Sequence, residues 1–413
     1  MATVSAPRVG TRHRWVVLGI GVAAQASFSA MFSGLPVTGV ELRAGYGLST
    51  GALGFVVGCL GLGVAAGDLV WGLLTDRFGD RRILLTGLLS TAALMAGMAV
   101  GAAPADGTGT ATLAACLFAA GALGGSVNGS SGRAVMTWFA DDRRGLAMSI
   151  RQTAIPAGGA VGVALLPPLA AASGFRAVYA VLTGFFLLSA AATARWLHEP
   201  DRERTTPQRR AGRSPLGDPD VWRVALASGL LTVPQFAVLA FTAVFLHDAR
   251  HADAAVAAAV VLTAQIGGGA ARIWTGRRSD RGADRRTAIR VIGLLTALAM
   301  AAATATTHAP LPLTVAALAT AGLLANAWHG VAYTEIAVTA GADRAGTALG
   351  LEGTTVFGAA FITPLVVPAL LGATSWTAVW AFAAAAPLLA VPLTPAAVRA
   401  SGRAPSSRAG SGR

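Results

Sequence analysis

Long apolar segments separated by short polar ones follow each other along almost the whole chain. Each apolar segment holds about twenty residues with little or no charge, which is enough for a helix to cross a hydrocarbon core of about 30 Å. Inside a membrane only helices and closed barrels satisfy their backbone groups, and a barrel strand would need a short alternating pattern instead. The first segment is too long for the core of a signal peptide, so we expect it to be retained. The pattern predicts an all-α polytopic membrane protein with twelve spans at 15–37, 50–73, 83–103, 111–139, 145–171, 175–196, 221–247, 254–275, 287–307, 311–338, 345–371 and 375–397.

The composition agrees with this pattern. Hydrophobic residues make up 54% of the 413 residues, charged residues make up only 12%, and the mean hydropathy is +0.61. A soluble domain carries about 25% charged residues. Most of this chain is therefore not expected to be exposed to water.

Positive charge is concentrated in every second connection between the predicted spans. The 32 basic residues are all Arg, and they cluster near the start, at 77–82, 143–144, 195–223, 277–290 and 344, and at 399–413. The other connections and their edges hold only Arg43, Arg176 and Arg250. The positive-inside rule therefore places both termini in the cytoplasm. We expect the chain to lie in the cytoplasmic (cell) membrane. This bias also explains the net charge of +13 without a nucleic-acid partner, which would need a solvated basic face or a recognisable binding motif.

One long polar segment divides the chain into two halves. Residues 197–220 are rich in Arg, Pro and Asp, and we interpret them as a flexible cytoplasmic linker. The N-terminal half then spans 1–196 and the C-terminal half spans 221–397, with six spans each. The low-complexity segment 398–413 is expected to be a disordered, basic cytoplasmic tail.

The two halves repeat the same polar motif. The sequence GLLTDRFGDRR at 72–82 aligns without gaps with GRRSDRGADRR at 276–286, an offset of 204 residues. Further along, DRRGLAMSIRQT at 142–153 aligns with DRAGTALGLEGT at 343–354. Two six-span halves, each with an acidic and basic turn after its second span, are typical of transporters built from repeats.

On these motifs the chain resembles the major facilitator superfamily over nearly its whole length. The family pattern Gly-x-Leu-x-Asp-Arg-x-Gly-x-Arg-Arg is complete in the first copy, whereas Ala283 replaces the usual Gly in the second. The resemblance implies a twelve-helix secondary transporter, and we expect a monomer that binds a small-molecule substrate within the lipid bilayer.

The two motif copies provide the candidate gating residues. Asp76 and Asp280 are predicted at helix ends, where a carboxylate can accept hydrogen bonds from a neighbouring helix terminus or from arginine and so latch the halves together. The alternative is that the motifs only anchor the chain through positive charge, but this leaves the paired Gly and Asp unexplained. The candidates are Gly72, Asp76, Arg77, Gly79, Arg81, Arg82, Gly276, Asp280, Arg281, Arg285 and Arg286.

Six charged residues lie within the predicted spans, away from the flanking arginines. A charge inside the membrane is expensive, so each is a functional candidate. Arg133 is near a span end, and we expect a structural role as a partner of Asp76. The other five are Asp68, Arg151, Arg272, Glu335 and Glu352.

Arg272 and Asp68 occupy equivalent positions in the repeat. Each stands eight residues before its motif Asp, or about 12 Å deeper along a helix. In the similar nitrate and oxalate–formate exchangers, an Arg at this place in span eight binds the anion, so Arg272 is a candidate substrate-binding residue. The nitrate type has a second Arg where Asp68 stands, and the oxalate–formate type has a Lys in span eleven that this chain lacks. An ion pair between Arg272 and Asp68 is the competing hypothesis.

Arg151 and Glu352 form a second equivalent pair. Arg151 lies in SIRQTAIPAGG, which resembles span five of small-anion and organic-acid members such as cyanate transporters. Drug antiporters usually have Gly-Pro before a Gly pair, but here Ile155 precedes Pro156. This difference favours an anion substrate over a drug.

Three carboxylates and several polar residues complete the candidate site. Asp68, Glu335 and Glu352 are the candidate proton carriers, because a carboxylate removed from water binds a proton more readily. Glu335 could instead pair with Arg133 or Arg151. Hydrogen bonds that only pack helices are the alternative for the candidate substrate-binding residues, which besides Arg151 and Arg272 are Gln25, Asn128, Gln235, Asn326 and His329.

No phosphate-binding loop, metal-ligand spacing or nucleophile motif is present, so we expect neither an enzyme nor a cofactor or metal. The favoured hypothesis is a secondary transporter of a small organic anion or related metabolite, driven by protons or by exchange. The alternatives are a drug efflux antiporter and a membrane sensor of the same fold that binds its ligand without moving it.

Overall fold

The structure is a computed structural model that describes residues 12–198 and 214–395. It is built from helices, and the described residues contain no strand. The long and short α-helices are α1 (His13–Val37), α2 (Gly39–Gly45), α3 (Thr50–Phe78), α4 (Asp80–Gly101), α5 (Thr110–Gly124), α6 (Ser126–Trp138), α7 (Arg144–Trp196), α8 (Pro219–Val244), α9 (Ala254–Asp280), α10 (Arg285–Ala305), α11 (Leu311–Asn326), α12 (His329–Ala340), α13 (Ala345–Ala373) and α14 (Trp376–Leu393).

These helices supply the twelve predicted spans. In the described part of the chain, 11 helical segments are long and apolar enough to cross a membrane, when α5 and α6 count as one segment and α11 and α12 as another. One of them, α7, has 53 residues, and Gly174 interrupts it with φ 70° and ψ −178°. Gly174 thus divides α7 into spans five and six, and the all-α twelve-span prediction is confirmed.

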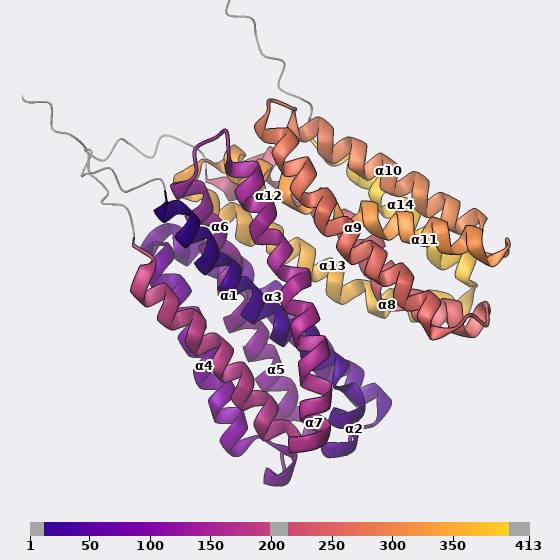
Figure 1. The fold of residues 1–413 in the computed structure, drawn as a ribbon, viewed down its shortest axis with the longest axis horizontal. Helices are drawn as coiled ribbons and strands as arrows, with labels where there is room; N and C mark the ends of the chain where they lie inside the picture. Colours follow the sequence, from indigo (N-terminus) through magenta and orange to yellow (C-terminus); the bar gives the residue numbers. More distant parts are fainter. Residues whose placement is uncertain (1–11, 199–213, 396–413) are drawn as a thin grey trace, which may run out of the picture.

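The spans form two bundles of six. Figure 1 shows α1 to α7, from indigo to magenta, beside α8 to α14, from salmon to yellow, and the bundles converge toward the end that holds α6 and α12. We call this the motif end, because both motif loops lie there. Each half has an apolar core of its own, and a third core, which includes Met148 and Trp328, draws residues from both halves.

The halves meet at the motif end through two helix pairs. α3 lies against α13, and a Cβ atom on Gly72 would stand 2.3 Å from the carbonyl oxygen of Gly346. α7 lies against α9 in the same way, and a Cβ atom on Gly276 would stand 2.5 Å from the carbonyl oxygen of Gly145. Only glycine allows such a close approach of two backbones. The motif glycines therefore let the two halves pack tightly.

The linker prediction needs a small correction at its end. Helix α8 begins at Pro219, two residues before the predicted start of the C-terminal half, and the Asp218 side chain accepts a hydrogen bond from the backbone N–H of Asp220. Asp218 is thus an N-cap, which explains why the helix starts inside a polar stretch. Residues 199–213 of the linker and the whole predicted tail lie outside the described residues.

The second motif loop replaces its missing glycine. In the first copy Gly79 ends α3 with φ 95°, whereas the second copy has Ala283 at this place. There Gly282 takes φ 93°, one residue earlier than the alignment suggests. A left-handed residue therefore turns both loops, although the two motifs differ.

We expect Gly282→Ala to destabilise the protein, whereas Ala283→Gly should leave its stability nearly unchanged. A side chain in the left-handed region costs about 1–2 kcal/mol, and only Gly282 has that backbone conformation. The apparent melting temperatures of the two purified variants provide the measurement. Equal melting temperatures would contradict the assignment of the turn to Gly282.

Candidate functional site

Asp76 joins the two halves at the motif end. Its carboxylate accepts hydrogen bonds from the backbone N–H groups of Gly346 (2.9 Å) and Thr347 (2.7 Å) and from the Thr347 hydroxyl (2.6 Å). These donors lie at the start of α13, where free N–H groups and the positive end of the helix dipole favour an anion. Asp76 therefore binds the N-terminal half to the first turn of α13 in the other half.

Asp280 repeats this contact in the other direction. Its two carboxylate oxygens accept hydrogen bonds from the backbone N–H groups of Gly145 (2.7 Å) and Leu146 (2.8 Å), at the start of α7. The predicted contact of each motif Asp with a helix terminus across the halves is thus present. We call the Asp76 and Asp280 contacts the motif latches.

Arg133 supports the first latch. It lies in α6, its Nε atom is 3.2 Å from Asp76, and its Nη1 atom is 2.6 Å from Asp80. The predicted pairing of Arg133 with Asp76 is confirmed. Since both partners belong to the same half as Arg133, it holds Asp76 in position for α13.

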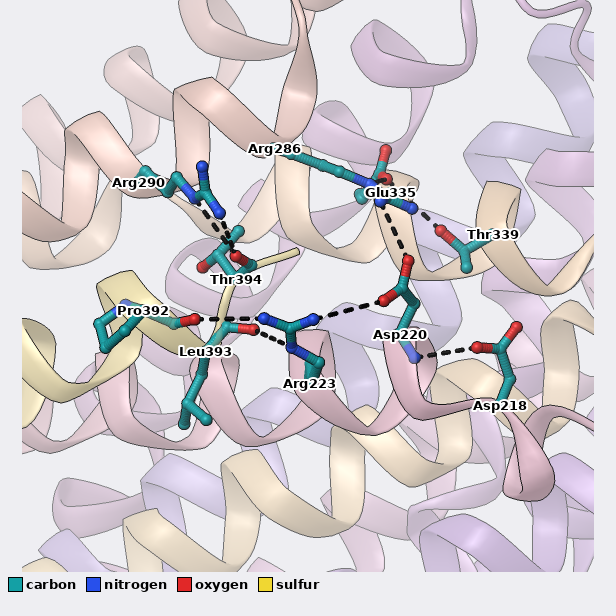
Figure 2. Close-up of polar contacts among 10 residues, drawn as sticks. All are labelled: Asp218, Asp220, Arg223, Arg286, Arg290, Glu335, Thr339, Pro392, Leu393 and Thr394. Carbon is teal, nitrogen blue, oxygen red and sulfur yellow. Dashed lines mark hydrogen bonds and ion pairs between the residues drawn. The ribbon is translucent and has the colours of Figure 1, made fainter. Parts of the chain in front are cut away.

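Glu335 is also part of the motif end, which corrects the prediction that it pairs with Arg133 or Arg151. Its Oε1 atom is 2.6 Å from Arg286 Nε, and Arg286 also contacts Asp220 at 3.0 Å (Figure 2). Glu335 is followed by only five residues of α12, so the motif arginines of the C-terminal half reach it. At the motif end, α6 thus carries a basic residue, Arg133, whereas the corresponding helix α12 carries an acidic one, Glu335.

Most other motif arginines contact their own half or face outward. Arg81 donates to the carbonyl oxygen of Ala194 (2.8 Å), Arg77 lies over the ring of Phe78, and Arg285 is 4.0 Å from Glu335. Arg82 and Arg281 are exposed. These positions suit anchoring of the motif end, so the contacts between halves come from the two Asp residues.

A buried polar network crosses the centre of the N-terminal half. Gln25 donates to the Asn128 side chain (3.1 Å), and Asn128 donates to both oxygens of Asp68 (3.1 and 3.0 Å). Arg151 donates to the Gln25 side chain (2.9 Å), the carbonyl oxygen of Asn128 (2.6 Å) and the Ser131 hydroxyl (2.7 Å). The structure therefore brings four of the predicted site residues together.

The C-terminal half contains the matching network. Gln235 donates to the Asn326 side chain (3.0 Å), as Gln25 does to Asn128. Arg272 donates to the Asn326 side chain (2.8 Å) and to its carbonyl oxygen (2.7 Å). The same carbonyl lies 3.3 Å from a ring nitrogen of His329. Arg272 thus takes the place that Asp68 has in the first half, with the opposite charge.

Arg272 and Asp68 do not form the alternative ion pair. Arg272 instead donates to the carbonyl oxygen of Gln152 in the other half, at 3.0 Å. Asp68 points at Gly353, where a Cβ atom would lie 1.9 Å from its Oδ2 atom. Each charge therefore contacts the opposite half through backbone, so the two halves do not share an ion pair at this level.

Glu352 is the counterpart of Arg151 in the C-terminal half. Its side chain is fully buried, and its Oε1 atom accepts a hydrogen bond from the Ser228 hydroxyl at 2.7 Å. Arg151 and Tyr333 lie close enough to interact electrostatically with it. The centre of the protein thus holds two acidic and two basic residues. Asp68 and Arg151 of the N-terminal half are replaced by Arg272 and Glu352 at the equivalent positions of the C-terminal half.

Sequence reasoning missed four polar contributors. Ser131, Gln152 and Ser228 contact the buried charges directly, and Tyr333 interacts electrostatically with Arg151, Asp68 and Glu352. Tyr333 is only 4% exposed, although it lies two residues from Glu335. Tyr333 could have been found from the sequence, because it is a polar residue close to a charged one within an apolar segment. In the described ranges, no three or more His, Cys, Asp and Glu side chains lie close enough to hold a metal ion.

Comparisons with known proteins agree with the described architecture. A family model described as the Major Facilitator Superfamily matches residues 16–363. An uncharacterized MFS-type transporter of Mycobacterium tuberculosis is 29% identical over 391 residues, which cover 94% of this chain and 86% of that protein.

Solved structures share the fold at lower sequence identity. The human organic anion transporter TETRAN has a TM-score of 0.74 at 16% identity, covering 93% of this chain and 99% of its own. The proton:xylose symporter XylE has a TM-score of 0.73 at 15% identity, covering 92% and 95%. FucP in an outward conformation has a TM-score of 0.71 at 12% identity, covering 93% and 99%.

Proposed function

Because the chain belongs to the major facilitator superfamily, we propose that it is a secondary transporter that moves a small organic anion across the cytoplasmic membrane by alternating access. MFS transporters bind small molecules within the membrane, and the paired halves supply the two bodies that such a cycle needs. Proton coupling or exchange would drive the transport.

Two buried arginines that form no ion pair within 4 Å in the described structure carry the anion proposal. Arg151 and Arg272 are 0% and 2% exposed, and neither lies within 4 Å of a carboxylate of the described residues. Their hydrogen bonds go to neutral oxygens, at Gln25, Asn128 and Ser131 or at Asn326 and Gln152. Buried charges in membranes usually pair with opposite charges. A substrate carboxylate is the partner that both guanidinium groups suit, because they offer a planar fork of donors.

A screen of ligands against the purified protein tests the proposal. Carboxylates, sugars and antibiotics are compared by thermal shift, and the best ligand is then measured for uptake into reconstituted vesicles. We expect stabilisation by a small carboxylate and its transport. Stabilisation by antibiotics alone would favour drug efflux, whereas binding without flux would favour a sensor.

We also propose that the motif end faces the cytoplasm, so that the conformation described here is open to the outside. The arginine-rich connections at this end support the proposal. In a variant without Cys59 and Cys116, single cysteines at Thr205, in the linker outside the described residues, and at Thr108 should react from opposite sides of the membrane. Reaction of both positions from outside intact cells would contradict the topology.

A further inference from the structure

One carboxylate oxygen in the centre of the protein has no partner. Glu352 Oε1 accepts the hydrogen bond from Ser228, but Oε2 is buried and, within the described structure, has no hydrogen-bond partner. It is the only carboxylate oxygen in this condition among the described residues. An ionised carboxylate with an unpaired oxygen is strongly disfavoured in a dry interior, and protonation removes the charge.

The other two candidate carboxylates have hydrogen-bond or ion-pair partners. Both oxygens of Asp68 accept hydrogen bonds from the Asn128 amide, which is in turn held by Gln25. Glu335 is ion-paired with Arg286 at 2.6 Å. Protonation of either one would weaken contacts that are already made. The three acids are therefore not equivalent.

We propose that Glu352 is the site at which the transported proton binds, and that Asp68 and Glu335 serve as fixed parts of the structure through the contacts they already make. The proton adds to Oε2, the carboxylate becomes a neutral carboxylic acid, and the same O–H bond breaks when the proton leaves on the other side. The polar and charged groups near it in the described structure include Ser228 from α8, Tyr333 from α12 and Arg151 from α7. They also include Asp68 from α3, whose carboxylate points at the neighbouring Gly353. This inference rests on the proposed transport function.

The burial of Oε2 favours a proton over any larger cation. An ammonium group or metal ion would need space and further oxygen ligands at Oε2, whereas the oxygen is enclosed and no metal cluster exists in the described chain. A proton needs neither. Access requires only that water reaches Glu352 when the helices around it rearrange.

Protonation of Glu352 would also affect the candidate anion site. The Arg151 guanidinium interacts with two negative charges, Asp68 and Glu352. When Glu352 is neutral, one of these charges is removed, and Arg151 attracts a substrate anion more strongly. By reciprocity, a bound anion then favours the protonated form of Glu352. The geometry therefore favours a proton and an anion moving in the same direction.

Infrared difference spectroscopy of the solubilised protein tests the proposal without a substrate. The carbonyl band of a protonated carboxyl group is followed from about pH 6 upward, where ordinary exposed carboxyl groups are already ionised, in the parent protein and in the Glu352→Gln, Asp68→Asn and Glu335→Gln variants. We expect a titrating band that disappears completely in Glu352→Gln and persists in the other two. Ser228→Ala keeps the carboxyl group and should shift the band, which covers the case that Glu352→Gln fails to fold.

Two results would overturn the proposal, namely a titrating band that survives in Glu352→Gln and a band that is lost in Asp68→Asn or Glu335→Gln. A parent protein with no titrating carboxyl band would overturn it as well. The readout is independent of transport. If Glu352 binds a proton but no anion is carried in vesicles, the proposed function fails and the proton site stands.

Discussion

In Asp76→Asn, we expect the motif end to open more often, with the closed conformation losing about ten- to a hundredfold in population. The substitution keeps the size of the side chain but removes the charge, and a hydrogen bond to a charged group contributes about 1.5–3 kcal/mol. Asp76 accepts three such bonds at the start of α13 and is supported by Arg133. Transport should slow, with substrate binding largely retained.

Asp280→Asn should act in the same direction but more weakly. Asp280 accepts two backbone hydrogen bonds and has no arginine within 4 Å in the described structure. Asp248→Asn is the control, because Asp248 lies at the opposite end with its side chain 62% exposed. Uptake into vesicles at matched protein amounts provides the measurement. Normal uptake in both latch variants would leave only the anchoring role for the motifs.

In Arg272→Lys, we expect the affinity for the best carboxylate of the ligand screen to fall by about a hundredfold. A point charge replaces a fork of donors that can bind both oxygens of a carboxylate. Lysine also cannot maintain the contacts to Asn326 and Gln152 together. Arg250→Lys is the control, since Arg250 also donates to backbone carbonyls but lies at the opposite end. The measurement is the dissociation constant of this carboxylate for each purified variant.

The double variant Arg272→Ala with Asp68→Ala separates anion binding from charge balance. The two side chains have different partners in the structure, so removing both should not restore what either single change loses. Recovery of full uptake in the double variant would contradict the anion-binding role of Arg272. It would indicate instead that the two residues pair in another conformation of the cycle.

The sequence was sufficient for the fold and for the motif latches. Span lengths and the arginine bias follow from the membrane itself, which acts on each segment separately. The latches were predictable because Asp76 and Asp280 lie at helix ends in both repeats, and a repeated helix end brings the same free N–H groups to each. Arg133 was placed correctly with Asp76 for a similar reason, since it lies near the same end, in span four.

The partners of the central charges could not be predicted in the same way. Glu335 was placed within a span, but its partner depends on which loop passes the end of α12, and this is set by packing between helices. The contact of Gln152 with Arg272 could not be predicted either, because Arg272 donates to the backbone carbonyl of Gln152 and not to its side chain. Backbone carbonyls leave no trace in a pattern of polar side chains. The sequence shows that positions 68 and 272, and positions 151 and 352, carry opposite charges. It does not show that the charged groups of each pair lie more than 4 Å apart.

Distances across the two ends of the protein test the central claim, that the latched motif end opens and closes during the cycle. In a background of Cys59→Ser and Cys116→Ser, spin labels are attached at exposed residues, Asp142 and Ala342 at the motif end and, in a second sample, Ala105 and His308 at the opposite end. Pulsed electron resonance then compares each pair with and without Asp76→Asn and Asp280→Asn together. We expect the motif-end distance to increase while the opposite distance decreases. Unchanged distances, or changes of the same sign at both ends, would contradict alternating access controlled by the motif latches.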